Sequence, residues 1–381
     1  MTKREIKGIG AIKGFAALVI AQFHMYFLNL PEGMTLPFSK KLQLGYAYGW
    51  FMVELFFLLS GFLMFYSHAR RIACKERRGA EFLYDRFARL YPTYFTTLLY
   101  CAGLVVISRL FDLNVNFAAS TITNFVLGLF MVHYIGFNPP EYSFDFPAWF
   151  LSALLLCYIS FYLIAKKGTT KGRQILGICI MLMFGLMCFR IYQISPQIYF
   201  PITNIDVGRG MISFYVGGLL SYVYKSINGA KVRKRKLLII TLWITVVLVC
   251  YFAIRRFEDR SFEIILGDTR QFCSLFLFPL FVLAVLSTPL LVSLLECSVF
   301  RFLGAISYDI FLWHFPIIQT INIVKEITEW NIPYDSPYFF AAYYGIVISV
   351  AVLSYHLITV PGKNFLMAKK EKVLQFLNSA V

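Results

Sequence analysis

The sequence of 381 residues is 59% hydrophobic and only 15% charged, and its mean hydropathy is +0.67. A soluble domain carries about 25% charged residues, so this composition excludes an ordinary soluble protein and indicates a polytopic membrane protein. The net charge of +16 would suit nucleic acid in a soluble chain, but in a membrane chain the Lys and Arg of cytoplasmic loops account for it, and we expect no nucleic-acid partner.

Eleven apolar runs divide the chain, and one of them is too weak to be assigned as a span from hydropathy alone. The runs lie near residues 8–29, 45–67, 92–111, 121–137, 147–165, 174–193, 207–224, 237–254, 271–292, 303–324 and 338–360. If the short run at 121–137 does not cross, the cytoplasmic segments hold 26 Lys and Arg and the outer loops hold 7. If it does cross, the tally becomes 16 against 17. The positive-inside rule therefore favours the first arrangement.

The predicted fold is an all-α integral-membrane protein of about ten transmembrane helices with both termini in the cytoplasm. Residues 112–146 then form an outer segment with one re-entrant or surface helix, which is tolerated only where protein or a cavity covers it. Residues 1–365 form the membrane domain, and residues 366–381 form a cytoplasmic tail. The eight Cys include no CxxC pair, so we expect no disulfide, no structural zinc and no other metal site.

The first span, residues 6–30, carries two groups that lipid disfavours, Lys13 and His24. They are 11 residues apart, almost three helical turns, so they share one helix face about 16 Å apart along the axis. An ionisable residue inside a span usually faces a protein interior or a water-filled cavity and is a functional candidate. The alternative for His24 is a hydrogen bond to another helix.

The second span contains Glu54 about nine residues from its outer end, followed by Ser60 and Gly61 at mid-depth. An unpaired carboxylate in lipid costs several kcal/mol, so we expect Glu54 to pair with a cation or an imidazole. A small pair such as Ser60-Gly61 allows another backbone to approach closely, and packing alone is enough to explain it.

The first cytoplasmic loop is basic, and its last two arginines differ from the rest. Residues 70–78 suit the anionic heads of lipids and the topogenic rule. Arg86 and Arg89 instead lie three residues apart on a helical run that leads into the next span. Two guanidinium groups on one face can bind phosphates bidentately, and a topogenic cluster is the equally weighted alternative.

The later spans add further polar candidates. Residues 141–146 place aromatics beside carboxylates, which suits either sugar binding or an interfacial aromatic belt, and the belt alone is the simpler explanation. Arg209 follows Asp206 by three residues, so the two can neutralise each other. Ser307 and His314 are seven residues apart, two turns along one helix face, with His314 near mid-membrane.

Five motifs in this order resemble the type 3 membrane acyltransferases, bacterial enzymes that O-acylate surface polysaccharides, lipopolysaccharide, nodulation factors and related molecules. The family's opening motif is similar to residues 13–24, with a basic residue, small residues and then His. Its acidic-LFF-SGF motif resembles 54–62, and its RxxRxxP motif resembles 86–92. Its WxLS element is similar to 149–152, and its SYxxxLWHxP motif to 307–316. The resemblance covers nearly the whole chain.

The chain departs from the family pattern at four positions. The family usually has Arg where Lys13 stands and an acidic residue where Gly10 stands. Many members carry Glu at the positions of Leu154 and Thr359. Lysine keeps the charge but loses the forked geometry of arginine, so these departures leave the subgroup and the acceptor open. Some members add an outer hydrolase-like domain at the C-terminus. The sequence stops at Val381, so we expect any such domain to be supplied by a separate protein.

The resemblance implies a reaction and assigns roles. The donor is cytoplasmic acyl-CoA, acetyl-CoA by default and succinyl-CoA as the alternative, with no permanently bound cofactor, and the acceptor is a surface polysaccharide or glycolipid beside the inner membrane of a bacterium. His24 removes the acceptor proton or forms an acyl-histidine, and Glu54 holds the imidazole or opposes the charge that it develops. Lys13 contacts the CoA arm or orients its helix, and Arg86 and Arg89 bind the CoA phosphates. The other substrate-binding candidates are Ser60, Trp149, Arg209, Ser307 and His314.

Two rival classes stay open at this point. Buried His, Glu and Lys also build proton relays, so a proton-coupled transporter or flippase of a polar solute or glycan precursor is the main alternative. An inverted repeat would favour that class, and we find none. A non-catalytic scaffold of an export complex has no use for His24, Glu54 and the arginine pair together.

Overall fold

The computed structural model describes residues 6–113, 115, 120–135, 143–194, 204–258 and 269–379. Every regular element in these ranges is helical, which confirms the predicted all-α fold. Parts of the predicted outer segment, among them Glu141 and Tyr142, lie outside the described residues. The chain divides into two compact units, and each is described by itself.

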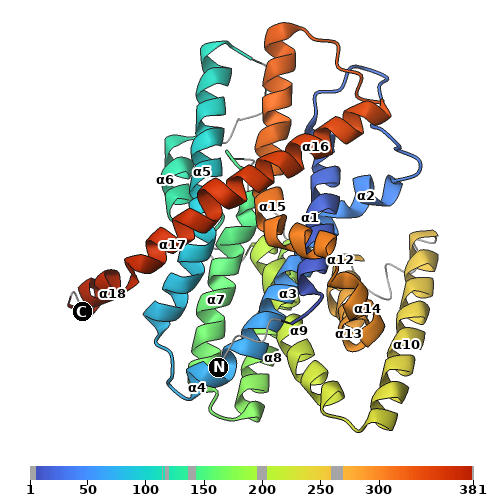
Figure 1. The fold of residues 1–381 in the computed structure, drawn as a ribbon, viewed down its shortest axis with the longest axis vertical. Coiled ribbons are helices and arrows are strands. Elements are labelled where there is room, and N and C mark those ends of the chain that lie inside the picture. The colour runs from blue at the N-terminus through green and yellow to red at the C-terminus, as the bar shows by residue number, and fades with distance from the viewer. Residues whose placement is uncertain are drawn as a thin grey trace. The chain divides into compact units, whose positions relative to one another are not determined.

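Unit 1 comprises residues 1–14, 51–76 and 156–304. Its own helices are α3 (Met52–Ser67), α4 (Ala69–Ala73), α8 (Lys171–Ile194), α9 (Ile205–Asn228), α10 (Val232–Glu258), α12 (Thr269–Phe272), the π-helical turn η5 (Cys273–Leu277), α13 (Phe278–Ser287) and α14 (Pro289–Leu295). Helices α3 and α8 both pack along α9, and α10 packs against α13 (Figure 1). Helix α9 is therefore the centre of this unit.

Glycines allow α3 and α9 to meet backbone to backbone. A Cβ atom added to Gly61 would lie 1.8 Å from the Phe214 carbonyl oxygen, and one added to Gly217 would lie 2.0 Å from the Leu58 carbonyl oxygen. No side chain fits at such distances, so the interface needs glycine at both positions. The predicted close approach at the Ser60-Gly61 pair is confirmed, and Gly61 is the residue responsible.

Unit 2 comprises residues 15–50, 77–155 and 305–381. Its own elements are η1 (Met25–Phe27), α2 (Gln43–Tyr48), α5 (Gly79–Leu110), α6 (Ile122–Leu129), η3 (Phe146–Ala148), α16 (Pro337–Ser354), the π-helical turn η6 (Tyr355–Thr359), α17 (Val360–Ala368) and α18 (Lys370–Ser379). The elements α16, η6 and α17 form one continuous helical rod, drawn in red in Figure 1. Four elements contribute to both units: α1 (Ile9–His24), η2 (Gly49–Phe51), α7 (Trp149–Lys167) and α15 (Ser298–Thr328).

The weak apolar run at 121–137 forms only the eight-residue helix α6. At 1.5 Å per residue α6 is about 12 Å long, whereas a membrane core is about 30 Å thick. The prediction that this run does not cross as a helix is therefore confirmed. Thr121 begins α6 as its N-cap, with its hydroxyl accepting the Asn124 backbone N–H.

Seven described helical segments are long and apolar enough to cross a membrane, and the pair α13–α14, bent by 91°, adds an eighth. Two further predicted spans coincide with α9 and α15, which have 24 and 31 residues but are too polar to meet the same criterion. The polar groups that lower their hydropathy include Arg209, Asp309 and His314. The count of ten spans and the cytoplasmic termini stay predictions.

Candidate active site

The two deep histidines of the sequence meet inside unit 2. His24 is the last residue of α1, His314 lies in the middle of α15, and His314 Nε2 is 3.1 Å from His24 Nδ1. His24 is 5% exposed and His314 is 0% exposed. The hydrogen bond between helices that was the alternative for His24 is present, and its partner is a second titratable side chain. The two residues therefore form one unit, which we call the histidine pair.

The backbone around the histidine pair selects its tautomers. His314 Nδ1 lies 3.1 Å from the carbonyl oxygen of Ile310, and His24 Nδ1 lies 3.0 Å from that of Ile20. A neutral imidazole carries one N–H, and a carbonyl oxygen can only accept, so in the neutral pair both Nδ1 atoms carry the proton. His314 Nε2 then accepts from His24 Nδ1–H. The lone pair of His24 Nε2 is left for chemistry.

Aromatic rings surround His24 on several sides. The ring centroids of Phe23 and Phe27 lie 5.0 and 5.7 Å from that of His24, and those of Phe146 and Phe315 both lie 6.1 Å away. We call these four rings the aromatic cage. An apolar surround of this kind excludes bulk water from the imidazole and strengthens the electrostatic interactions it makes.

Helix α15 also fixes the backbone that follows His24. The Asn322 side-chain amide donates to the Phe27 carbonyl oxygen at 2.8 Å and accepts the Asn29 backbone N–H at 2.9 Å. Lys325 Nζ donates to the Asn29 carbonyl oxygen at 2.5 Å. Sequence reasoning missed Asn322, although its position eight residues after His314 continues the polar stripe of α15. The two hydrogen bonds of Asn322 fix the backbone at residues 27–29, and they thereby fix the position of the Phe27 ring.

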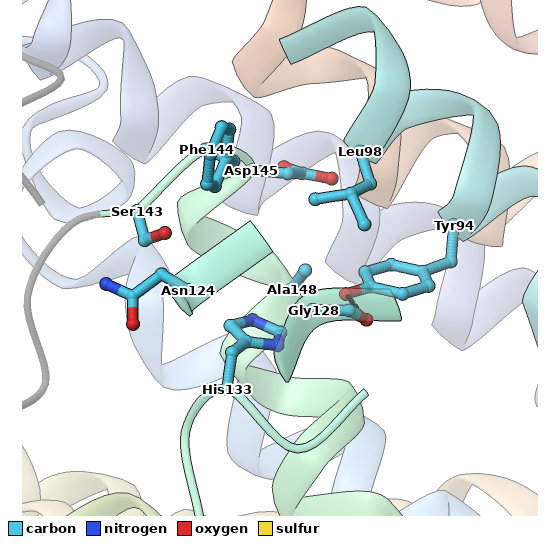
Figure 2. A pocket seen from close by; sticks show the side chains of 9 residues that line it. All are labelled: Tyr94, Leu98, Asn124, Gly128, His133, Ser143, Phe144, Asp145 and Ala148. Atoms are coloured by element: carbon cyan, nitrogen blue, oxygen red, sulfur yellow. Dashed lines mark hydrogen bonds between the residues drawn. The ribbon is translucent and has the colours of Figure 1, made fainter. Parts of the chain in front are cut away.

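A second group of buried polar side chains lies beside the element η3 (Figure 2). Asp145 is 2% exposed, and its Oδ2 accepts from Thr97 Oγ1 at 2.9 Å, while its Oδ1 has no hydrogen-bond partner among the described residues. Nδ1 of His133 is likewise buried without a partner there. The Tyr94 hydroxyl donates to the Gly128 carbonyl oxygen at 2.6 Å.

Tyr94, His133 and Asp145 line a cavity of about 10 Å³, which has room for one water molecule. Burial raises the pKa of Asp145 to about 7 and lowers the pKa of His133 to about 4. The outer segment thus holds a titratable carboxyl whose neighbour Phe146 belongs to the aromatic cage. The sequence suggested an interfacial aromatic belt or a sugar site for residues 141–146, and the structure shows that the Phe144 and Asp145 side chains are buried inside the protein.

Glu54 pairs with a cation, as predicted, and the cation is Arg209. Glu54 is 1% exposed, and its Oε1 accepts from Arg209 Nε at 2.7 Å, while Arg209 Nη1 donates to Asp206 Oδ1 at 2.8 Å. We call these three residues the ion triad. The triad confirms the predicted Asp206–Arg209 pairing and extends it across two helices. Because Glu54 belongs to unit 1 and His24 to unit 2, the role of Glu54 toward the imidazole stays a prediction.

The two candidate phosphate ligands lie on α5 with the predicted spacing but in different surroundings. Arg86 is buried, and its guanidinium lies 5.9 Å from the centroid of the Phe82 ring. Arg89 is exposed. A phosphate arriving at the surface would therefore meet Arg89 directly. Phosphate binding by either residue stays a prediction.

The remaining candidates are spread over both units. Trp149 is buried at the start of α7, and Ser307 is buried on α15 two turns before His314. Lys13 and Ser60 are half-buried, on α1 and α3. Of all the predicted site residues, the structure brings together His24 with His314, and Glu54 with Arg209. The roles predicted for the others are untested.

Two comparisons with known proteins found matches that cover most of the chain. A family model described as an acyltransferase domain matches residues 6–356. A protein of Acidianus two-tailed virus, ORF330, whose name marks it as a proposed acetyltransferase, is 24% identical over 329 residues, which cover 85% of this chain and 87% of the viral protein. No solved structure matches the chain.

Proposed function

Because the chain belongs to the acyltransferase 3 family, we propose that this acyltransferase is a membrane O-acyltransferase working on glycans. It moves an acetyl group, or alternatively a succinyl group, from cytoplasmic acyl-CoA to a hydroxyl of a surface polysaccharide or glycolipid. The proposed location of the enzyme is the inner membrane of a bacterium. The observation that carries this proposal is the histidine pair inside the aromatic cage.

His24 is the proposed general base. Its Nε2 takes the proton of the acceptor hydroxyl as that oxygen attacks the thioester carbonyl carbon. The carbon–sulfur bond then breaks, and the imidazolium returns the proton to the departing CoA sulfur, so no net proton is released. An acyl-histidine formed at the same Nε2 would reach the same products in two transfers.

His314 is a positioning residue in this scheme. Its Nε2 accepts the His24 Nδ1–H, which keeps the lone pair of His24 on Nε2 and stabilises the imidazolium that forms. The aromatic cage keeps water from competing with the acceptor for the thioester. Acyl transfer rather than hydrolysis is the expected result of this arrangement.

Arg86 and Arg89 are the proposed ligands of the CoA phosphates. Phosphate contacts are largely the same in the ground state and the transition state, so they lower KM rather than raise kcat. Arg86→Gln and Arg89→Gln should each raise the KM for acyl-CoA about tenfold or more, with kcat changed less. An unchanged KM for acyl-CoA in steady-state kinetics would indicate that both residues only help to set the membrane topology.

The test of the function uses the full-length protein in liposomes with radiolabelled acetyl-CoA and a glycan extract of the source cell. Label should enter the glycan with wild type, and His24→Ala should slow the transfer about 100- to 10,000-fold, because general base catalysis contributes rate factors of this size. The matched control is His356→Ala, because this histidine is exposed on η6 and lies outside the histidine pair. Full transfer by His24→Ala would refute the mechanism, and pH-dependent solute flux without any transfer would favour a transporter.

A further inference from the structure

One cavity in unit 1 belongs to none of the sites above. It measures about 530 Å³ and is open on one side. Pockets for small molecules usually measure 300–1,000 Å³, so this one has the size of a ligand site. It lies near the C-terminal ends of α3 and α9 and the N-terminal end of α10. These three helix ends contribute Tyr66, Tyr224 and Arg235, respectively, to its lining.

The bend between α13 and α14 forms one wall of this cavity. Thr288 separates the two helices, Pro289 begins α14, and the chain turns by 91° there. Proline cannot continue the hydrogen-bond ladder of the preceding helix, which explains the break. Trp243 Nε1 donates to Thr288 Oγ1 at 3.0 Å and fixes the corner, and Pro289 and Val292 on α14 then line the cavity.

The cavity is positively charged. Lys7 and Arg235 line it, and Glu296 is the one carboxylate among its lining residues. Glu296 already accepts the Gly8 backbone N–H at 2.7 Å. The guanidinium of Arg235 makes one long contact, 3.5 Å from Nη2 to the Ser287 carbonyl oxygen. Its buried Nε has no hydrogen-bond partner within the described ranges, so Arg235 retains donors for an anion.

Two tyrosine rings give the same cavity an aromatic side. The centroids of Tyr66 and Tyr224 are 5.9 Å apart with the rings inclined by 60°. Lys225 Nζ lies 4.8 Å from the Tyr66 centroid, which adds a third cation beside the cavity. Cations next to flat rings and apolar side chains suit a ligand that joins a phosphate to a ring or an apolar group.

The charge pattern also indicates the side from which a ligand arrives. Residues 225–236, which join α9 to α10, hold six Lys and Arg. The positive-inside rule predicts that this end of unit 1 faces the cytoplasm. The ligand would then come from the cytoplasm or from the inner leaflet of the membrane.

We propose that the unit 1 cavity binds a phosphate ester, with Arg235 and Lys7 holding the phosphate and Tyr66 and Tyr224 packing on the group attached to it. Two sources carry this chemistry on that side: a second CoA molecule, distinct from the one whose phosphates Arg86 and Arg89 are proposed to bind, and the head group of an anionic phospholipid. Only the first source rests on the function proposed above. The cavity itself is independent of that function.

The test compares two arginines of one helix in the full-length protein. Arg235→Gln removes the guanidinium at the cavity, and Arg233→Gln removes an exposed one two residues earlier in α10. CoA is titrated into protein in phosphatidylcholine nanodiscs by calorimetry, and phosphatidylglycerol binding is followed by native mass spectrometry. A charge-assisted hydrogen bond contributes about 1.5–3 kcal/mol, so Arg235→Gln should weaken the binding of CoA or of phosphatidylglycerol roughly 10- to 100-fold. Arg233→Gln should weaken the binding of either less than about twofold.

The outcomes separate the two sources and the two proposals. Loss of CoA binding in Arg235→Gln, together with a similar loss in Tyr66→Leu, supports the second CoA. Loss of phosphatidylglycerol binding alone supports the lipid. Equal effects of the two arginine variants, or no binding of either probe to wild type, would overturn the site. CoA binding that depends on Arg235 without acyl transfer by wild type would refute the proposed function and leave the cavity standing.

Discussion

Unit 2 buries two histidines against each other, whereas unit 1 buries a guanidinium between two carboxylates. The histidine pair is neutral when each Nδ1 keeps its proton, and it can accept one more proton for a short time. The ion triad instead combines two carboxylates and one guanidinium in one hydrogen-bonded set. The difference teaches that burial alone does not identify a catalytic group. Chemistry is expected where a buried group can change its protonation, and stability is expected where it cannot.

Breaking the ion triad should give the largest loss of stability. Arg209→Gln leaves Glu54 buried as an unpaired carboxylate, and breaking a buried pair in this way costs about 3–5 kcal/mol. The free energy of unfolding in detergent, measured by denaturant titration, should fall by that amount. Asp206→Asn should cost less, because the Asp206 side chain is 14% exposed against 1% for Glu54.

A double variant distinguishes a structural triad from a chemical one. Glu54→Gln combined with Arg209→Met removes both charges, so it should recover most of the stability that Arg209→Gln loses. Transfer activity per folded molecule should recover with it. If the double variant is stable but inactive, the triad takes part in the reaction and the contrast with the histidine pair fails.

Breaking the histidine pair should instead act on turnover. His314→Ala removes the acceptor of the His24 Nδ1–H, and a hydrogen bond to a group that becomes charged is worth about 1.5–3 kcal/mol. Initial rates should therefore show kcat reduced about 10- to 100-fold with KM for acyl-CoA nearly unchanged. His314→Gln keeps an acceptor oxygen near the place of Nε2 and should recover part of kcat. A raised KM with normal kcat would make His314 a substrate ligand.

The glycine contact between α3 and α9 offers a smaller test within unit 1. A Cβ at position 61 would meet the Phe214 carbonyl oxygen at 1.8 Å, so Gly61→Ala must push the helices apart. Overpacking of this kind costs about 1–3 kcal/mol, to be measured as a lower unfolding midpoint. The control is Gly103→Ala on α5, where nothing lies within 4 Å of the added atom. There the midpoint should stay the same or rise slightly, because alanine favours helix.

The cavity beside η3 should show its effect in the pH dependence of stability. The pKa of Asp145 is raised to about 7, so the folded state keeps a proton that the unfolded state loses above about pH 4. Asp145 therefore lowers stability as pH rises from about 4 to 7. The pKa of His133 is lowered to about 4, so below about pH 6.5 the unfolded state alone takes up its proton. His133 therefore raises stability as pH rises from about 4 to 6.5.

In the wild-type protein these two contributions oppose each other. Relative to wild type, Asp145→Asn should gain stability as pH rises from about 4 to 7, and His133→Gln should lose stability as pH rises from about 4 to 6.5. Each difference should approach about 1 kcal/mol per pH unit. Thermal midpoints of the three proteins measured from pH 4 to 8 check both signs. Parallel curves for wild type and Asp145→Asn would contradict a buried, titrating Asp145.

The all-α fold and the separate histidines were predictable because lipid penalises polar groups so strongly. His24, Glu54 and His314 were identified as candidates from their depth in apolar runs alone. Charge counting also identified 121–137 as a run that does not cross, which the eight-residue α6 bears out. The hydropathy pattern is a local property, so the sequence carries it directly.

The partners of these groups were not predictable in the same way. Arg209 is 155 residues from Glu54, and His314 is 290 residues from His24, so only the packing of distant helices joins them. Residues 141–146 were attributed to an interfacial aromatic belt because several of them are aromatic, and the sequence did not show that the fold buries Asp145. Asn322 was overlooked because an amide carries no charge. Hydrophobic pattern sets which face a helix buries but not which helix covers it.

The most direct test of the central claim is the initial transfer rate of wild type, His24→Ala, His314→Ala and the double variant, measured in liposomes at one pH with saturating acyl-CoA. If the two histidines act as one unit, removing both should slow transfer no more than His24→Ala alone, because His314 acts only through His24. If the two single losses multiply in the double variant, His314 has an independent role and the account of a positioned base is wrong.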